Sequence, residues 1–354
     1  MLTNLPRPLA WLALVILLAT SAWCLTATPP PIKTAKKGGY TDVRLYHDIA
    51  SEVAKGKPYH LAAAELHRQH HYPLKPFVTM RPPTLVWLAA QIGWAGLQTI
   101  AYGLSFIAML AWVMAFERRL DWTERVLVAV AVGAACSVVV NQGLMALHEY
   151  WAGWFTGIAL AFVVGWPRQW WLALVPAALG LMVRELALPF VLLALAFAIV
   201  ERRGREAAAW AALIVAFAIG MAIHAHEVAA ILRPGDLSSP GWNAGQGFSA
   251  FLKAVIYTSP LQDLPLNLAL LAAMLPLFGW LALAGRGGLF AVLFVVGDAV
   301  MISAFSRADT FYWGAIMLPH YFVGFALLPR AIWQLWQACA HEPEARKPFP
   351  LTVH

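Results

Sequence analysis

Residues 207–223 read AAAWAALIVAFAIGMAI, an apolar run that contains no charged side chain. The charged segment 201–206 precedes this run and His224 follows it, so polar residues mark both ends. A helix of about 20 apolar residues spans the hydrocarbon core of a bilayer, so the stretch predicts a membrane-crossing helix. Similar runs recur and predict an all-α polytopic membrane protein with about ten transmembrane helices. The expected crossings lie near residues 9–27, 98–116, 125–141, 150–166, 169–183, 186–200, 207–223, 264–283, 288–304 and 313–330.

The composition indicates a membrane protein and argues against a soluble domain. Hydrophobic residues make up 61% of the 354 residues, and Asp, Glu, Lys and Arg together make up 12%. Soluble domains carry about 25% charged residues, so this chain lacks the charges needed to cover a water-exposed surface. The net charge of +7 is explained by Lys and Arg in short loops beside anionic membrane lipids, and no nucleic-acid partner is expected.

Two stretches depart from simple crossings. Residues 83–97 are apolar but follow directly from a polar loop, and we expect a helix that dips into the outer leaflet before the second crossing. Residues 169–200 offer about 30 residues for two crossings. One of these two is therefore expected to be short, or broken around Arg184 and Pro189.

The distribution of Lys and Arg predicts the orientation. One set of alternate loops carries twelve of these residues and the other set of short loops carries four, which predicts cytoplasmic termini. The first loop opposes this bias with nine more, but its length reduces its weight. We expect a single membrane domain over residues 1–354, with a first external loop at 28–82, a second at 224–262 and a cytoplasmic tail at 331–354.

The first external loop contains a short amphipathic helix. Thr41 or Asp42 can cap its start, and Gly56 and Pro58 end it. Such an interfacial helix lies on the membrane surface. Asp42 stands where the chain leaves the lipid, and we expect it to face an enclosed, partly wet cleft. The apolar face is formed by Val43, Tyr46, Ile49, Ala50 and Val53, and the opposite face by Asp48, Glu52 and Lys55.

The spacing Asp-x3-Tyr-x3-Ala-x5-Gly-x2-Tyr is formed by Asp42, Tyr46, Ala50, Gly56 and Tyr59, shortly after the first crossing. This pattern resembles the first external loop of the GT-C superfamily of polyprenol-phosphate-dependent glycosyltransferases. Within that superfamily it is most similar to glycosyltransferase family 87, which includes mannosyltransferases. The resemblance covers roughly the first third of the chain, whereas the later helices match only in general layout. It implies a GT-C-like helical fold and transfer of a sugar from a lipid-linked donor.

The resemblance assigns Asp42 the role of catalytic base. An acceptor hydroxyl is a poor nucleophile at neutral pH, and a positioned carboxylate can accept its proton during attack on the sugar carbon. The departing lipid phosphate needs positive charge rather than an acid. The alternative is that Asp42 only caps a surface helix. Asp48 and Glu52 are interpreted as charges on the solvated face.

Three arginines are candidate ligands of the donor phosphate. Arg81 precedes two prolines and stands where a lipid headgroup arrives; its alternative role is an arginine that extends to the membrane interface. Arg184 can clamp a phosphate through two parallel hydrogen bonds, or form a structural ion pair between helix ends. Arg307 lies in the last outer turn, where an interfacial anchor is the alternative.

Five further residues are candidate substrate contacts. Glu185 can orient the phosphate or bind sugar hydroxyls. His148 and Glu149 fall on the same side of the membrane as the catalytic carboxylate and can contact sugar. His320 lies inside the final crossing, where a hydrogen-bonded core residue is the alternative. Tyr46, one turn after the catalytic carboxylate, completes the set.

No metal site or cofactor is expected. His67, His70 and His71 would share one face if residues 61–71 are helical, and that spacing suits a metal ion. However, no fourth ligand is evident in the sequence. A divalent metal stays open as an alternative, because some members of the superfamily depend on one.

We therefore predict an inverting glycosyltransferase of the inner (plasma) membrane that acts on the periplasmic or extracellular face. The predicted donor is a polyprenyl-phosphate-linked sugar, and the acceptor is a hydroxyl of a lipid, a glycan or a protein. Two alternatives remain, a transporter or flippase of lipid-linked sugars and a polysaccharide ligase or polymerase. A flippase would not need Asp42, and ligases or polymerases usually carry their large external loop late in the chain.

Overall fold

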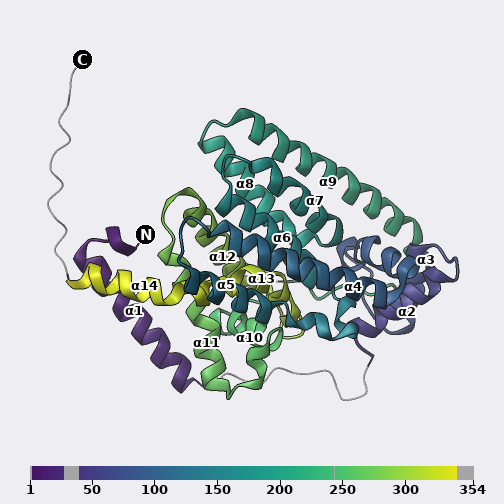
Figure 1. The fold of residues 1–354 in the computed structure, drawn as a ribbon. Helices are drawn as coiled ribbons and strands as arrows, with labels where there is room; N and C mark the ends of the chain where they lie inside the picture. Colours follow the sequence, from purple (N-terminus) through teal and green to yellow (C-terminus); the bar gives the residue numbers. More distant parts are fainter. Residues whose placement is uncertain (1, 28–39, 243, 341–354) are drawn as a thin grey trace.

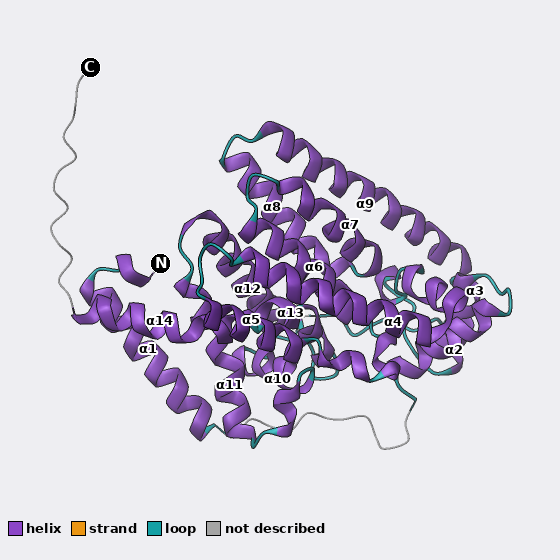
Figure 2. Cartoon of the chain, in the orientation of Figure 1, coloured by secondary structure: helices purple, strands orange, loops and turns teal. Residues whose placement is uncertain are grey.

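The computed structural model describes residues 2–27, 40–242 and 244–340, which form a bundle of helices (Figure 1). Figure 2 shows helices and loops and no strand in the described part of the chain. One isolated backbone bridge joins Lys75 and Ser238. The all-α prediction is therefore confirmed for these residues.

Fourteen α-helices follow one another through the described ranges and are joined by short 3₁₀ segments. Three 3₁₀ segments matter for the site: η2 (Phe77–Thr79), η6 (Glu185–Ala187) and η9 (Phe311–Ile316). The α-helices are α1 (Arg7–Thr26), α2 (Asp42–Ala54), α3 (Tyr59–Gln69), α4 (Thr84–Ala115), α5 (Trp122–Ala135), α6 (His148–Gly165), α7 (Leu174–Val183), α8 (Leu188–Val200), α9 (Gly204–Ile231), α10 (Phe248–Tyr257), α11 (Leu266–Gly279), α12 (Gly285–Phe305), α13 (Leu318–Tyr321) and α14 (Val323–Ala340).

Four helical segments of the described chain are long and apolar enough to cross a membrane: Arg7–Thr26, Phe77–Ala115, Gly204–Ile231 and Gly285–Phe305. Each contains most or all of one expected crossing: 9–27, 98–116, 207–223 and 288–304. The remaining expected crossings correspond to shorter helices, among which α7, α8 and α11 are apolar. The length and composition of these helices are consistent with a membrane protein.

α4 is interrupted once, at Gly93. This residue has φ 72° and ψ 168°, a conformation that residues with a Cβ rarely adopt, so glycine permits the chain to change direction there. Residues 84–92 and 94–115 are therefore two helices in succession. The helix expected before the second crossing is present, and it ends at this glycine.

The helix expected at residues 207–223 extends further at both ends, as α9. His224 and Val228 lie on the same buried stripe as Trp210, and they continue the helix because the external loop packs against them. The expected boundary at residue 224 is therefore wrong. The segment 224–262 begins as helix and also contains α10.

The last expected crossing, at residues 313–330, is replaced by three shorter pieces: η9, α13 and α14. α14 continues to Ala340 because Leu335 and Ala338 extend its buried face. Residues 331–340 are thus helical rather than part of a tail. Residues 341–354 lie outside the described part of the chain.

α6 lies at the centre of the bundle (Figure 1) and is buried along nearly its whole length. A Cβ atom at Gly153 would lie 2.8 Å from the carbonyl oxygen of Ala315, and one at Gly157 would lie 3.0 Å from Pro319. Small residues allow backbones to approach this closely. These two glycines therefore allow η9 and α13 to pack directly against α6.

α2 and α3 lie at one end of the molecule, far from α1 (Figure 1), and they are called the external lobe here for this position. Residues 232–242, called the strap here, run from α9 past this lobe. Arg68 of α3 pairs with Asp236 of the strap at 2.7 Å, and the Leu74 amide donates to the Leu237 carbonyl at 2.9 Å. The lobe and the strap are thus fastened to each other.

Candidate functional site

One cavity of about 990 Å³ lies between the external lobe, the strap, α6, α10 and η9. Its wall is unusually rich in phenol side chains, because six of the nine tyrosines of the chain line it. These are Tyr40, Tyr46, Tyr72, Tyr150, Tyr257 and Tyr312.

The predicted site residues divide into two groups around this cavity. Those that line it are Asp42, Tyr46, Arg81 and Arg307. Those that do not line it are Arg184, Glu185, His148, Glu149 and His320.

Asp42 is the first residue of α2 and lies in the cavity wall. The helix is capped by Thr41, whose side-chain oxygen accepts a hydrogen bond of 3.3 Å from the amide of Arg44. Because Thr41 fills the capping role, that role does not account for the carboxylate of Asp42. The hydroxyl of Tyr72 donates a hydrogen bond of 3.5 Å to the carbonyl of Tyr40, and burial followed by the charge of Asp42 raises the pKa of Tyr72.

The backbone at Arg81 is held from two sides. The hydroxyl of Tyr59 donates a hydrogen bond of 2.6 Å to the carbonyl of Arg81. A ring nitrogen of His224 lies 2.9 Å from the carbonyl of Met80 and must be the donor, since a carbonyl can only accept. The external lobe and α9 therefore fix the point from which the Arg81 side chain enters the cavity.

The guanidinium of Arg81 is largely buried, but few of its N–H groups donate to protein acceptors. Its Nη1 donates to the carbonyl of Val78 at 3.0 Å and lies 3.9 Å from the carboxylate of Glu185. A guanidinium has five N–H donors, and within the described residues the other donors of Arg81 have no hydrogen-bond partner. Arg81 therefore presents a fixed cation with unused donors to the cavity.

Arg184 has a different environment from the one predicted. Its side chain is 1% exposed, and its Nε donates to Glu149 at 2.7 Å while its Nη1 donates to Glu185. Glu185 in turn approaches Arg81. The predicted phosphate contact of Arg184 is thus replaced by a buried chain of alternating charges, the ion-pair alternative, since both carboxylates occupy its guanidinium.

His148 also lies outside the cavity wall. Its side chain is completely buried, and its ring packs edge-on against the ring of Tyr46 at a centroid distance of 4.8 Å. The side chain of His148 therefore does not reach the cavity in which a sugar would bind. Instead His148 supports Tyr46, which does line the cavity.

Arg307 lines the cavity, but its donors are already engaged. It forms a two-point pair with Asp309 at 2.9 and 3.1 Å, and its Nη1 donates to Ser239 at 3.2 Å and to the Gly241 carbonyl at 3.0 Å. Both acceptors of Nη1 belong to the strap. Arg307 therefore fastens the strap across the cavity, and it is a weaker candidate for a phosphate ligand than Arg81.

His320 is paired inside the bundle with an acid that the sequence analysis overlooked. Its Nε2 lies 3.2 Å from the carboxylate of Asp298, and the two side chains are 0% and 3% exposed. Neither residue lines the cavity, so His320 follows its core alternative and not the predicted substrate contact. Asp298 is the single acid in its apolar run, and the sequence pattern does not indicate that it pairs with His320 in another segment.

The three histidines considered for a metal do not converge. Burial lowers the pKa of His67 to about 4, and one of its ring nitrogens bonds to the carbonyl of Pro73 at 3.0 Å. His70 stacks on Tyr40 with ring centroids 3.4 Å apart, and His71 lies in the cavity wall. The described ranges contain no group of three or more side chains placed to share a metal ion.

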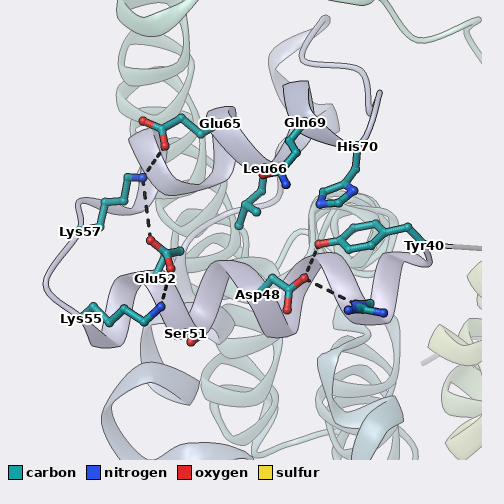
Figure 3. A pocket seen from close by; sticks show the side chains of 11 residues that line it. Tyr40, Asp48, Ser51, Glu52, Lys55, Lys57, Glu65, Leu66, Gln69 and His70 are labelled. Carbon is teal, nitrogen blue, oxygen red and sulfur yellow. Dashed lines mark hydrogen bonds and ion pairs between the residues drawn. The ribbon is translucent and has the colours of Figure 1, made fainter.

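A second cavity of about 640 Å³ lies between α2 and α3 (Figure 3). Its charges neutralise each other: Lys57 pairs with Glu65, Lys55 with Glu52 at 2.7 Å, and the Tyr40 hydroxyl donates to Asp48. Pairs of this kind on an exposed surface contribute little energy and leave few groups for a ligand. The larger cavity is therefore the better candidate.

Comparison of the chain with protein-family models, with curated proteins and with solved structures gave no match. Any functional conclusion therefore rests on the residues of the cavity and on the resemblance in the external loop.

Proposed function

We propose that the chain is an inverting, GT-C-like membrane glycosyltransferase that transfers one sugar from a polyprenyl-phosphate donor to a hydroxyl acceptor. The observation that carries the proposal is that Asp42 and Arg81 line the same cavity. Inverting transfer requires a base for the incoming hydroxyl and a cation for the departing phosphate. Asp42 and Arg81 supply one group of each kind.

The chemistry balances with these two residues. The acceptor oxygen forms a bond to the anomeric carbon while its proton passes to a carboxylate oxygen of Asp42. On the opposite face, the bond between the anomeric carbon and the phosphate oxygen breaks. The lipid phosphate leaves with the electron pair, and the guanidinium of Arg81 stabilises the added negative charge.

The size of the cavity suits this reaction. Small-molecule sites commonly enclose about 300–1,000 Å³, and this one encloses about 990 Å³. That volume accommodates a sugar phosphate together with one acceptor sugar. A prenyl tail would extend from the cavity between helices into the lipid.

The proposal places the chain in the inner (plasma) membrane, with about ten crossings, cytoplasmic termini and the cavity on the periplasmic or extracellular side. Four long apolar helices and several shorter ones support the location in a membrane. Exposed apolar side chains support it too: on α9, Ile219 and Ile223 are 57% and 60% exposed. Such side chains suit contact with lipid rather than water.

The decisive experiment compares transfer by the wild-type chain and by Asp42→Asn. Purified protein in lipid vesicles receives radiolabelled polyprenyl-phosphate sugars and the glycan fraction of the source membrane as acceptor. Asp42→Asn should lower transfer by about 10²- to 10⁴-fold, because the general base is lost, while the thermal unfolding temperature stays near that of the wild type.

Asp48→Asn is the matched control, because Asp48 lies nearly two turns further along α2, outside this cavity. It should retain transfer. Full transfer by Asp42→Asn would contradict the proposal. Movement of lipid-linked sugar across the vesicle membrane, without any transfer, would favour the flippase instead.

A further inference from the structure

Two of the tyrosines that line the cavity, Tyr46 and Tyr312, have hydroxyls without a hydrogen bond to another described residue. Tyr46 is 6% exposed and lines the cavity together with Tyr312. Neither hydroxyl has a hydrogen-bond partner among the residues that the structure describes. Both side chains line the cavity, where a ligand can supply the acceptors that the protein does not.

Both hydroxyls lie within the electrostatic reach of Arg81. Burial raises the pKa of Tyr46 to about 12. Burial and then the charge of Asp42 raise the pKa of Tyr312 well above its usual range, and the positive charge of Arg81 opposes both shifts. Each phenol is therefore protonated at neutral pH and acts as a donor. Three side chains with unused donors thus line one cavity.

Each of the three side chains is held from behind. His148 packs edge-on against the Tyr46 ring, and Tyr59 holds the backbone of Arg81. Tyr312 belongs to η9, which Gly153 seats against α6. Donors that are fixed before a ligand arrives need no reorganisation when it binds, which is the property of an effective oxyanion site.

We infer that the guanidinium of Arg81 and the hydroxyls of Tyr46 and Tyr312 form an anion subsite that binds one phosphate ester. The identity of the ligand as the donor headgroup rests on the proposed function. A phosphate has several acceptor oxygens and satisfies donors that arrive from three directions. The subsite contains one cation, and Glu185 lies 3.9 Å from it, so a single phosphate fits better than a diphosphate.

The test is a binding measurement on the full chain in detergent, with farnesyl phosphate as the probe. Tyr46→Phe and Tyr312→Phe should each weaken binding about tenfold, because each removes one hydrogen bond to a charged group. Tyr257→Phe is the matched control, since Tyr257 lines the same cavity without an interaction with Arg81. It should bind as the wild type does.

Other probes separate the possible sources of the phosphate. Farnesol should bind weakly and equally to all variants, and farnesyl diphosphate should bind more weakly than the monophosphate. Farnesyl phosphate binding far tighter than inorganic phosphate identifies a lipid headgroup, and equal affinities identify a free phosphate ester. In either case the two tyrosine variants must weaken the binding.

The inference is overturned if both tyrosine variants bind farnesyl phosphate with wild-type affinity, or if Tyr257→Phe weakens binding equally. Because Tyr312 is less buried than Tyr46, its variant keeps the test valid if Tyr46→Phe does not fold. Binding that depends on the tyrosines without any sugar transfer would refute the proposed function alone. Sugar transfer that is unchanged in both tyrosine variants would refute the subsite alone.

Discussion

The hydroxyl of Tyr59 donates a hydrogen bond of 2.6 Å to the backbone carbonyl of Arg81, across 22 residues of sequence. Tyr59 is the last residue of the Asp-Tyr-Ala-Gly-Tyr pattern, and Arg81 is the cation of the proposed site. The pattern therefore does more than shape a surface helix. Its final tyrosine holds the segment that carries the guanidinium.

Tyr59→Phe should destabilise the chain by about 1–3 kcal/mol, because it leaves a buried carbonyl without a donor. The affinity for a prenyl phosphate should fall as well, since the Arg81 backbone loses one of its two supports. Thermal unfolding and binding measurements check both effects. Tyr102→Phe is the control, because Tyr102 is 49% exposed, and it should change neither quantity.

Gly56→Ala should also destabilise the external lobe. Gly56 has φ 94°, outside the region that residues with a Cβ prefer, so the substitution should cost about 1–2 kcal/mol. A Cβ would meet nothing within 4 Å, so any loss must come from backbone strain. Gly103→Ala, in a helix and also in open space, should be neutral or stabilising. Equal effects of the two variants in thermal unfolding would contradict this explanation.

Glu149→Gln should be strongly destabilising. Glu149 and Arg184 are 2% and 1% exposed, and removing one charge of a buried pair costs about 3–5 kcal/mol. Glu52→Gln, at an exposed pair with Lys55, should be far less destabilising, because solvent screens that pair. The unfolding free energies of the two variants give the comparison. A small effect of Glu149→Gln would mean that the buried chain of charges is not needed for the fold.

The stability should depend on pH through His67. Burial lowers the pKa of His67 in the folded chain to about 4, below its ordinary value of about 6.5. Because the pKa of His67 is lower in the folded chain than in the unfolded chain, protonation favours unfolding. The stability that neutral His67 contributes is therefore complete above about pH 6.5 and is lost as the pH falls toward 4. The expected loss is about 3 kcal/mol.

His67→Gln should flatten this part of the pH profile of thermal unfolding. His226→Gln should leave the profile unchanged, because His226 is exposed on α9. An unaltered slope in His67→Gln would assign the pH dependence to another group.

Local features of the structure could be predicted from the sequence. The amphipathic spacing and the glycine after it placed α2 closely, and Asp42 stands at its first position. The polar interruption in the apolar stretch 169–200 also marks a real break, since α7 ends before Arg184 and α8 begins at Leu188. These features depend on neighbouring residues, which a sequence pattern reports directly.

Contacts between distant segments could not be predicted in this way. The partner of Arg184 is Glu149, 35 residues away, and the acceptors of Arg307 lie in the strap, 66 and 68 residues away. Periodicity carries no information about such pairs. The sequence therefore identified Arg184 and Arg307 as charged residues of interest without distinguishing internal partners from groups open to a ligand.

The position of α6 has a consequence for the cavity. Glu149 near its start leads through Arg184 and Glu185 to Arg81, while Gly153, one turn later, bears the segment that carries Tyr312. A single turn of one helix thus helps to position both the segment that carries Arg81 and the segment that carries Tyr312. A peripheral helix such as α1 can tilt with the thickness of the surrounding lipid without altering the spacing between those two segments.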